Sequence, residues 1–98
     1  MVSPIELRDG LIAAGAKKVT VLNEHECLIT LVEIYGSRFV VAVFEGERAL
    51  YAKVIPEDEV PSLACTNLLY SPKGLYVFAS SLEELCRGII AKAKSFRV

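Results

Sequence analysis

The chain has 98 residues, enough for one domain with a single hydrophobic core. Hydrophobic residues make up 53% of it and charged residues 23%, so we expect some apolar surface to meet a partner. The formal net charge of -1 excludes a general electrostatic field that would attract phosphates. We expect residues 1–98 to form one cytoplasmic domain without a signal peptide or a membrane-spanning segment.

The cysteines, and the scarcity of residues that degrade at high temperature, give two further expectations. Cys27, Cys65 and Cys86 are odd in number, far apart and in no CxxC pair. This pattern predicts reduced, mostly buried thiols and argues against a disulfide framework and against a zinc site. The chain has no Gln or Trp and only one Met, a scarcity that suggests a thermophilic source.

The first predicted element is a helix. Ser3-Pro4-Ile5-Glu6 has the form of a capping box, in which Ser3 is the N-cap and Glu6 reaches back to it. Gly15 can adopt the left-handed conformation that ends a helix. The pattern therefore predicts a helix over residues 4–14.

A β-meander is predicted next. Apolar and polar residues alternate from Lys17 to Ile55, with many β-branched and aromatic residues. Gly36-Ser37 and Gly46-Glu47 each place glycine first in a two-residue turn, which suits a type II′ hairpin. We expect four antiparallel strands, at residues 17–23, 26–35, 38–45 and 48–55.

The segment after the meander allows two interpretations. Residues 62–70 could form a short helix, or a strand from Thr66 that pairs across the turn Ser71–Gly74 with the strand-like LYVFA. We prefer the hairpin. Ser81-Leu82-Glu83-Glu84 is a second capping box, and the apolar stripe behind it predicts a final helix to residue 94.

These elements predict an α+β fold: an N-terminal helix, a four-stranded antiparallel meander, a further hairpin or strand, and a long C-terminal helix. If Tyr35 pairs with Arg38, and Glu45 with Arg48, the faces of the sheet follow from residue parity. One face is apolar and must be the core beneath both helices, with Glu45 and Arg48 able to pair at its rim. The other, here called the second face, carries Lys18, Thr20, Leu22, Cys27, Ile29, Leu31, Glu33, Tyr35, Arg38, Val40, Ala42, Phe44, Ala49, Tyr51, Lys53 and Ile55.

The second face mixes aromatic and basic residues on an apolar floor, a kind of patch that monomers rarely expose without a use. Bases of a single-stranded nucleic acid stack on aromatic rings, while Lys and Arg contact the phosphates. We therefore expect a non-enzymatic module that binds single-stranded DNA or RNA. The expected contacts are Tyr35, Phe44 and Tyr51 for stacking, Lys18, Arg38 and Lys53 for phosphates, and Lys73 with Tyr76 and Phe78 as an extension.

The predicted order of elements resembles that of small archaeal single-stranded DNA-binding domains of the ThermoDBP kind. The similarity covers element order and residue class, and no sequence motif carries it. It implies the same class of ligand and assigns no residue.

Two other uses of the second face remain open. Two copies could pack sheet to sheet as a homodimer, with a dry centre of Ile29, Leu31, Val40, Ala42 and Phe44 and with Arg38 facing Glu33 across the axis. Alternatively, the segment Cys65–Ala79 could fold back over this face and turn it into a second internal core.

Catalytic chemistry has little support in the sequence. His25 is the one histidine and is expected to be an exposed turn residue between two carboxylates. The acidic run 57–59 lacks the spaced oxygen ligands of a calcium loop, and no glycine-rich phosphate loop is present. We expect no catalytic residue, no metal site and no cofactor.

Overall fold

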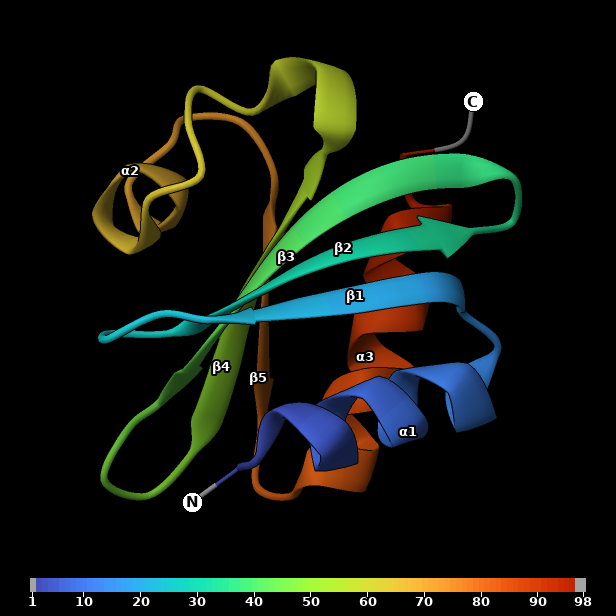
Figure 1. The fold of residues 1–98 in the computed structure, drawn as a ribbon, viewed down its shortest axis with the longest axis vertical. Coiled ribbons are helices and arrows are strands. Elements are labelled where there is room, and N and C mark those ends of the chain that lie inside the picture. The colour runs from blue at the N-terminus through green and yellow to red at the C-terminus, as the bar shows by residue number, and fades with distance from the viewer. Residues whose placement is uncertain (1, 97–98) are drawn as a thin grey trace.

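The computed structural model describes residues 2–96. Its five strands form one antiparallel sheet in the order β1-β2-β3-β4-β5 (Figure 1). None of the helices within residues 2–96 combines the length and apolar character that a membrane crossing needs. The elements are α1 (Pro4–Ala14), β1 (Lys17–Asn23), β2 (Leu28–Ile34), β3 (Ser37–Glu45), β4 (Leu50–Pro56), the 3-10 turn η1 (Glu57–Glu59), α2 (Cys65–Leu69), β5 (Leu75–Ala79) and α3 (Leu82–Lys94).

The N-terminal capping box is confirmed. The Ser3 hydroxyl accepts a hydrogen bond from the Glu6 backbone N–H, and the Glu6 carboxylate accepts one from the Ser3 backbone N–H. These two bonds satisfy backbone donors that the first turn of a helix leaves unpaired. Gly15 ends α1 with a φ of 119°, a conformation that favours glycine.

The capping box of α3 is only half confirmed. The Ser81 hydroxyl accepts from the Glu84 backbone N–H as expected. The Glu84 carboxylate, however, accepts from the backbone N–H and the hydroxyl of Ser80, one residue before the cap. Hydrogen bonds from Ser80 stabilise the ionised form and hold the pKa of Glu84 below its usual value.

The register predicted for the β2–β3 hairpin is wrong by two residues. Tyr35 does not pair with Arg38; Ile34 pairs with Ser37 instead, so Tyr35 and Gly36 form the turn. Their φ angles are 52° and 81°, and positive φ at both central residues is the mark of a type I′ turn. A shift of two residues preserves side-chain parity, so the face assignment is unaffected.

The β3–β4 hairpin differs from the prediction in the same way. Glu45 pairs with Leu50 rather than Arg48, which leaves a four-residue loop over 46–49. The Gly46 backbone N–H donates to the Ala49 carbonyl at 2.8 Å within this loop. The shift is again an even number, so the division of the meander into two faces is confirmed.

The preferred hairpin over residues 62–79 is wrong in its first half. Residues 65–69 form the short helix α2, and LYVFA forms β5, which pairs antiparallel with β4. Gly74 makes the approach to β5 possible, since it has a φ of 98° and a Cβ there would lie 2.6 Å from the Val54 carbonyl oxygen. The sheet therefore has five strands, and the segment before the fifth is a helix rather than the expected strand.

Helices α1 and α3 cover one face of the sheet, as predicted (Figure 1). They also pack closely on each other: a Cβ at Gly10 would lie 2.8 Å from the Cys86 sulfur. The core on this side is apolar, and its buried members include Leu7 and Leu11 from α1, Leu85, Ile89 and Ala93 from α3, and Val32, Val41, Val43, Ala52, Val54 and Val77 from the sheet.

Candidate binding surface on the second face

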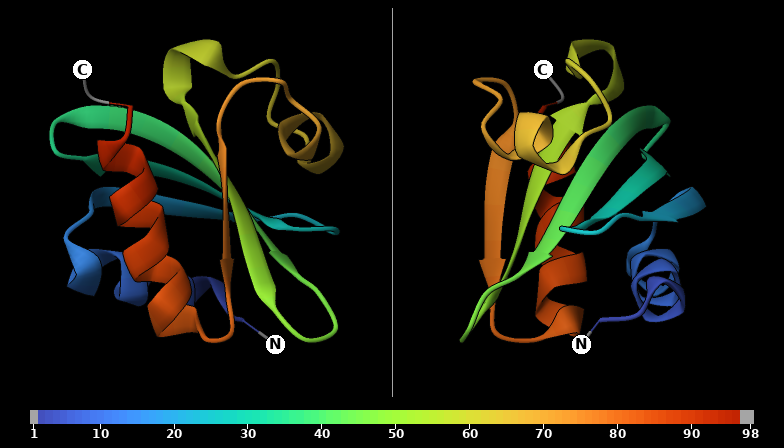
Figure 2. Two further views of the ribbon diagram at one scale, coloured as in Figure 1. Left: turned by 180° about the vertical axis from the view of Figure 1, so that it is seen from behind. Right: turned by 60° about the vertical axis from the view of Figure 1, so that its left-hand side comes forward.

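Much of the second face is closed by residues 60–71, which we call the cover segment. Helix α2 lies on the side of the sheet opposite α1 and α3 (Figures 1 and 2). Leu68 of α2 is buried in a second, smaller core. The alternative that Cys65–Ala79 folds back over this face is confirmed only for its first part, because Leu75–Ala79 joins the sheet as β5. The residues on the sheet side of this smaller core are Cys27, Ile29, Val40, Ala42, Phe44 and Ile55.

This cover corrects the expectation of a sheet-to-sheet homodimer. Ile29, Val40 and Ala42 were to form the dry centre of that interface, but each is at most 2% exposed beneath the cover segment. Side chains already buried within one chain have no apolar surface left to offer a second copy. The face can therefore act only where the cover segment ends.

A disulfide joins the cover segment to the sheet. Cys27, just before β2, is bonded to Cys65, the first residue of α2, across 38 positions of sequence. The prediction of reduced thiols is thus wrong for this pair. It fails because wide spacing and the absence of a CxxC pair say nothing of which residues the fold brings together.

Cys86 is the one free cysteine among residues 2–96 and is buried in the helix-covered core. Burial disfavours the charged thiolate and raises the pKa of Cys86 to about 11. The side chain is therefore a neutral thiol at physiological pH. It behaves as a small apolar core residue, as the sequence predicted.

Lys53 does not contact solvent, so the prediction that it binds phosphate is wrong. Its side chain is 1% exposed, and its ammonium donates to the carbonyl of Ser71 at 2.7 Å and to that of Leu69 at 3.3 Å. The same nitrogen lies 4.3 Å from the centre of the Tyr76 ring. A buried ammonium needs such partners because losing water is costly. Lys53 therefore fastens the cover segment to β4.

The other predicted cations lie at the far end of the sheet, away from Phe44 and Tyr51. Lys18 occupies a bulge at the start of β1, and its ammonium is 3.5 Å from the carboxylate of Glu33. Arg38 is the second residue of β3, and its guanidinium forms an ion pair with Glu57 of η1 at 3.2 Å. Both are exposed, yet each already has an acidic neighbour. The structure does not bring them together with the stacking residues.

Tyr35 also leaves the predicted platform. It lies in the β2–β3 turn, and the Lys94 ammonium of α3 is 4.8 Å from the centre of its ring. Helix α3 covers the opposite face of the sheet. The prediction that Tyr35 stacks a base beside Phe44 is therefore wrong, because the two-residue difference in register places Tyr35 in the turn and not in the strand.

Four aromatic rings form a row across the last three strands, which we call the aromatic strip. Phe44, Tyr51 and Phe78 are neighbours on β3, β4 and β5, and Tyr76 lies two residues along β5 on the same face. Ring centres are 5.1 Å apart for Phe44 and Tyr51, 6.1 Å for Tyr51 and Phe78, and 6.2 Å for Tyr76 and Phe78. All three pairs are stacked rather than edge-on.

The aromatic strip is buried at one end and open at the other. Phe44 is covered, Tyr51 is half-buried, Tyr76 is 41% exposed and Phe78 is 70% exposed. The Tyr76 hydroxyl donates to the Leu69 carbonyl, which ties the strip to the cover segment. Phe78 was expected only as an extension of the platform, because the sequence did not reveal that β5 pairs with β4. It is in fact the most exposed ring of the strip.

Two exposed cations lie near the ends of the aromatic strip. Arg48 is in the loop 46–49, between the strands that carry Phe44 and Tyr51. Lys73 is in the turn that leads into β5, three residues before Tyr76. Arg48 has no acidic partner in the structure of residues 2–96, and neither has Lys73. They are the basic groups best placed beside the exposed rings.

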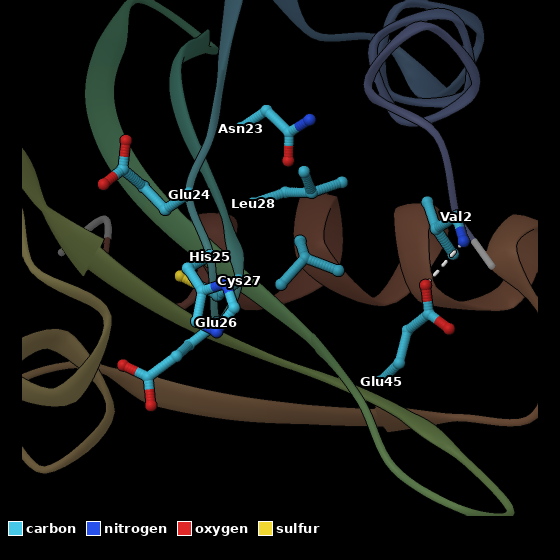
Figure 3. A pocket seen from close by; sticks show the side chains of 9 residues that line it. Val2, Asn23, Glu24, His25, Glu26, Cys27, Leu28 and Glu45 are labelled. Atoms are coloured by element: carbon cyan, nitrogen blue, oxygen red, sulfur yellow. Dashed lines mark hydrogen bonds between the residues drawn. The ribbon is translucent and has the colours of Figure 1, made fainter.

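A shallow hollow of about 240 Å³ lies at the β1–β2 turn, away from the aromatic strip, and acidic side chains line it. Figure 3 shows the carboxylates of Glu24, Glu26 and Glu45 well apart around it, with Glu45 accepting a hydrogen bond from the Val2 backbone N–H. His25 is exposed there, as predicted. Residues 2–96 contain no group of three His, Cys, Asp or Glu side chains that could hold a metal ion.

Comparison with protein-family models, curated proteins and solved structures finds no match to this chain. The resemblance to ThermoDBP-like domains is therefore without support from relatives. Any function must be argued from the aromatic strip and its surroundings.

Proposed function

We propose that the protein is a non-enzymatic module that binds single-stranded nucleic acid on the aromatic strip. Unpaired bases stack on the exposed rings of Phe78 and Tyr76 and on the half-buried ring of Tyr51, and the backbone passes between Lys73 and Arg48. This platform is smaller than the sequence predicted and lies nearer the edge of the sheet. The observation that carries the proposal is the stacked, solvent-exposed row of rings on β4 and β5.

The arrangement of the rings supports this ligand. Aromatic stacking is tolerant of sequence and contributes roughly 1 to 3 kcal/mol per base. The planes of neighbouring rings in the strip lie within 28° of each other, so successive bases can stack along it without a large change in direction. Because the buried Phe44 fixes one end of the strip and the Tyr76 hydroxyl is bonded to the cover segment, the platform is ordered before binding.

The charges around the strip limit the binding strength. Lys73 and Arg48 give two phosphate contacts, and the net charge of -1 adds no long-range attraction. We expect weak binding that depends mainly on stacking. The logarithm of the binding constant should fall by about 0.7 for each contact with every tenfold rise in salt, so a slope of about -1.4 is expected for two contacts.

The test is fluorescence anisotropy with a labelled oligothymidine and the full chain at several salt concentrations. Phe78→Ala removes the most exposed ring and should weaken binding by about tenfold. Lys73→Ala should weaken it less and reduce the salt slope by about 0.7.

Tyr35→Asn is the matched control, because Tyr35 is also an exposed ring but lies in the distant β2–β3 turn. Asn accepts the positive φ of that position, so the turn is kept. Binding by this variant should equal that of the unmodified chain. Absence of binding at low salt, or equal loss in Phe78→Ala and Tyr35→Asn, would overturn the proposal.

A further inference from the structure

Strand β5 has an unpaired outer edge in the described part of the chain. It pairs with β4 on one side, and the sheet ends there (Figure 2, right). Exposed sheet edges are usually protected by charges, proline, bulges or a covering element. The sequence LYVFA of β5 has none of these charges or prolines, and its Leu75, Tyr76 and Phe78 are exposed.

We infer that β5 is an interface for a second copy of this chain, which adds its own β5 antiparallel to form one continuous sheet. This inference goes beyond the nucleic-acid proposal and does not depend on it. The partner is argued from self-complementarity, since a two-fold interface must match its own surface.

Symmetry restricts the register of such a pairing. A two-fold axis perpendicular to the sheet keeps each side chain on the same face in both copies, so a residue can face only residues an even number of positions away. Only one of these registers pairs all five residues of β5, and in it Val77 of one copy faces Val77 of the other. It places Leu75 opposite Ala79 of the second copy, and Tyr76 opposite Phe78.

The contacts in this register are favourable on both faces. On the second face, Tyr76 and Phe78 of the two copies become cross-strand neighbours, so the aromatic strips of the two chains join into one row. On the helix-covered face, Leu75 meets Ala79, and both are apolar. Exposed rings at the edge thus become ring-to-ring contacts.

The charges beside β5 are complementary under the same symmetry. Lys73 lies just before β5 and Glu83 lies four residues after its end, so in this register both come to the same end of the paired strands, one from each copy. Lys73 is exposed, and Glu83 is an exposed residue that pairs with Arg87 of its own chain at 3.7 Å, so Lys73 would join an existing surface ion pair. The axis brings these groups together twice, once at each end of the paired strands.

The test is the mass of the full chain in solution by light scattering and sedimentation, over a range of protein concentrations. We expect twice the mass of one chain, falling on dilution. Leu75→Lys places a charge on the edge and should weaken the dimer by about tenfold or more. Leu63→Lys is the matched control, because Leu63 is an exposed leucine outside β5, and it should leave the mass unchanged.

Hydrogen exchange by NMR gives a second measurement that a merely unstable variant would not reproduce. In the dimer, the alternate β5 amides that do not bond to β4 are paired with the second copy and should exchange slowly. Leu75→Lys should speed exchange of those amides while the β4-paired amides stay protected. A single-chain mass at the highest soluble concentration would overturn the inference, as would a dimer equally stable in Leu75→Lys.

These outcomes separate the two proposals. Leu75 lies on the helix-covered face and is not part of the aromatic strip. If the dimer fails while oligothymidine binding persists, only the interface is wrong. If a dimer forms and no oligothymidine binds, only the nucleic-acid proposal is wrong.

Discussion

The two faces of the sheet are both buried at their centres but by different means. On one face, two helices of 11 and 13 residues supply long apolar stripes to an apolar core. On the other, the cover segment has a helix of only five residues, and it is held by a disulfide and by the buried Lys53 ammonium. A short element buries little apolar area, so specific cross-links replace part of the hydrophobic stabilisation.

The comparison predicts that core truncation costs most on the helix-covered face. Leu85→Ala should lower the free energy of unfolding by about 4 kcal/mol, because the side chain is fully buried between rigid elements. Leu68→Ala, the matched change within the cover segment, should cost about 2 kcal/mol, since a helix of five residues flanked by loops can move into the space. Urea denaturation measures both. Equal losses would show that the two covers are equally rigid.

The disulfide is expected to have the next largest effect. Cys27→Ala with Cys65→Ala should cost about 3 kcal/mol, mainly because the unfolded chain loses a constraint across 38 positions. Reducing agent should destabilise the unmodified chain by a similar amount and leave the double variant unchanged.

Counting the reactive thiols tests whether Cys27 and Cys65 are bonded to each other. Unfolded, unreduced protein should show one reactive thiol, that of Cys86, and three after reduction. Three reactive thiols before reduction would show that no disulfide holds the cover segment to the sheet.

Lys53 gives the smallest of the three effects. Lys53→Met keeps most of the side-chain volume but leaves the Ser71 and Leu69 carbonyls without their donor, at a cost of about 2 kcal/mol. Amide exchange should quicken within the cover segment and not in α1. A neutral or stabilising change would mean that burying the ammonium costs more than its bonds return.

The sequence predicted the helix-covered half of the molecule well. Capping residues located α1 and α3 closely, because caps and stripes are local signals. Alternation assigned the faces of β2, β3 and β4 correctly although two turns were misplaced, since each of those errors was an even number of residues. In β1 it holds only from Thr20 onward, because the register to β2 shifts by one residue between Lys17 and Thr20. The local sequence was sufficient to predict an element wherever its apolar residues recurred with a regular period.

The second face could be predicted only in part. Alternation put Lys53 on it but could not show that carbonyls 16 and 18 residues later fold over its ammonium. The choice of a strand over a helix at α2 failed because five residues carry too little periodicity to decide. Phe78 was undervalued for a similar reason: its position beside Tyr51 depends on a β4–β5 pairing that is not local.

The disulfide links two other predictions. Disulfides are rare in the reducing cytosol of mesophiles but persist in intracellular proteins of hyperthermophiles. The predicted cytoplasmic location is therefore compatible with the Cys27–Cys65 bond if the predicted thermophilic source is also correct.

The same bond makes a closed covalent ring of the chain from Cys27 to Cys65, which contains β2, β3 and β4. The exposed acidic turn η1 lies inside this ring. A protease that cuts there opens the ring without releasing a fragment, because the piece that carries α2, β5 and α3 stays attached through sulfur. This exposed turn is thus one at which a single cut leaves the molecule in one piece.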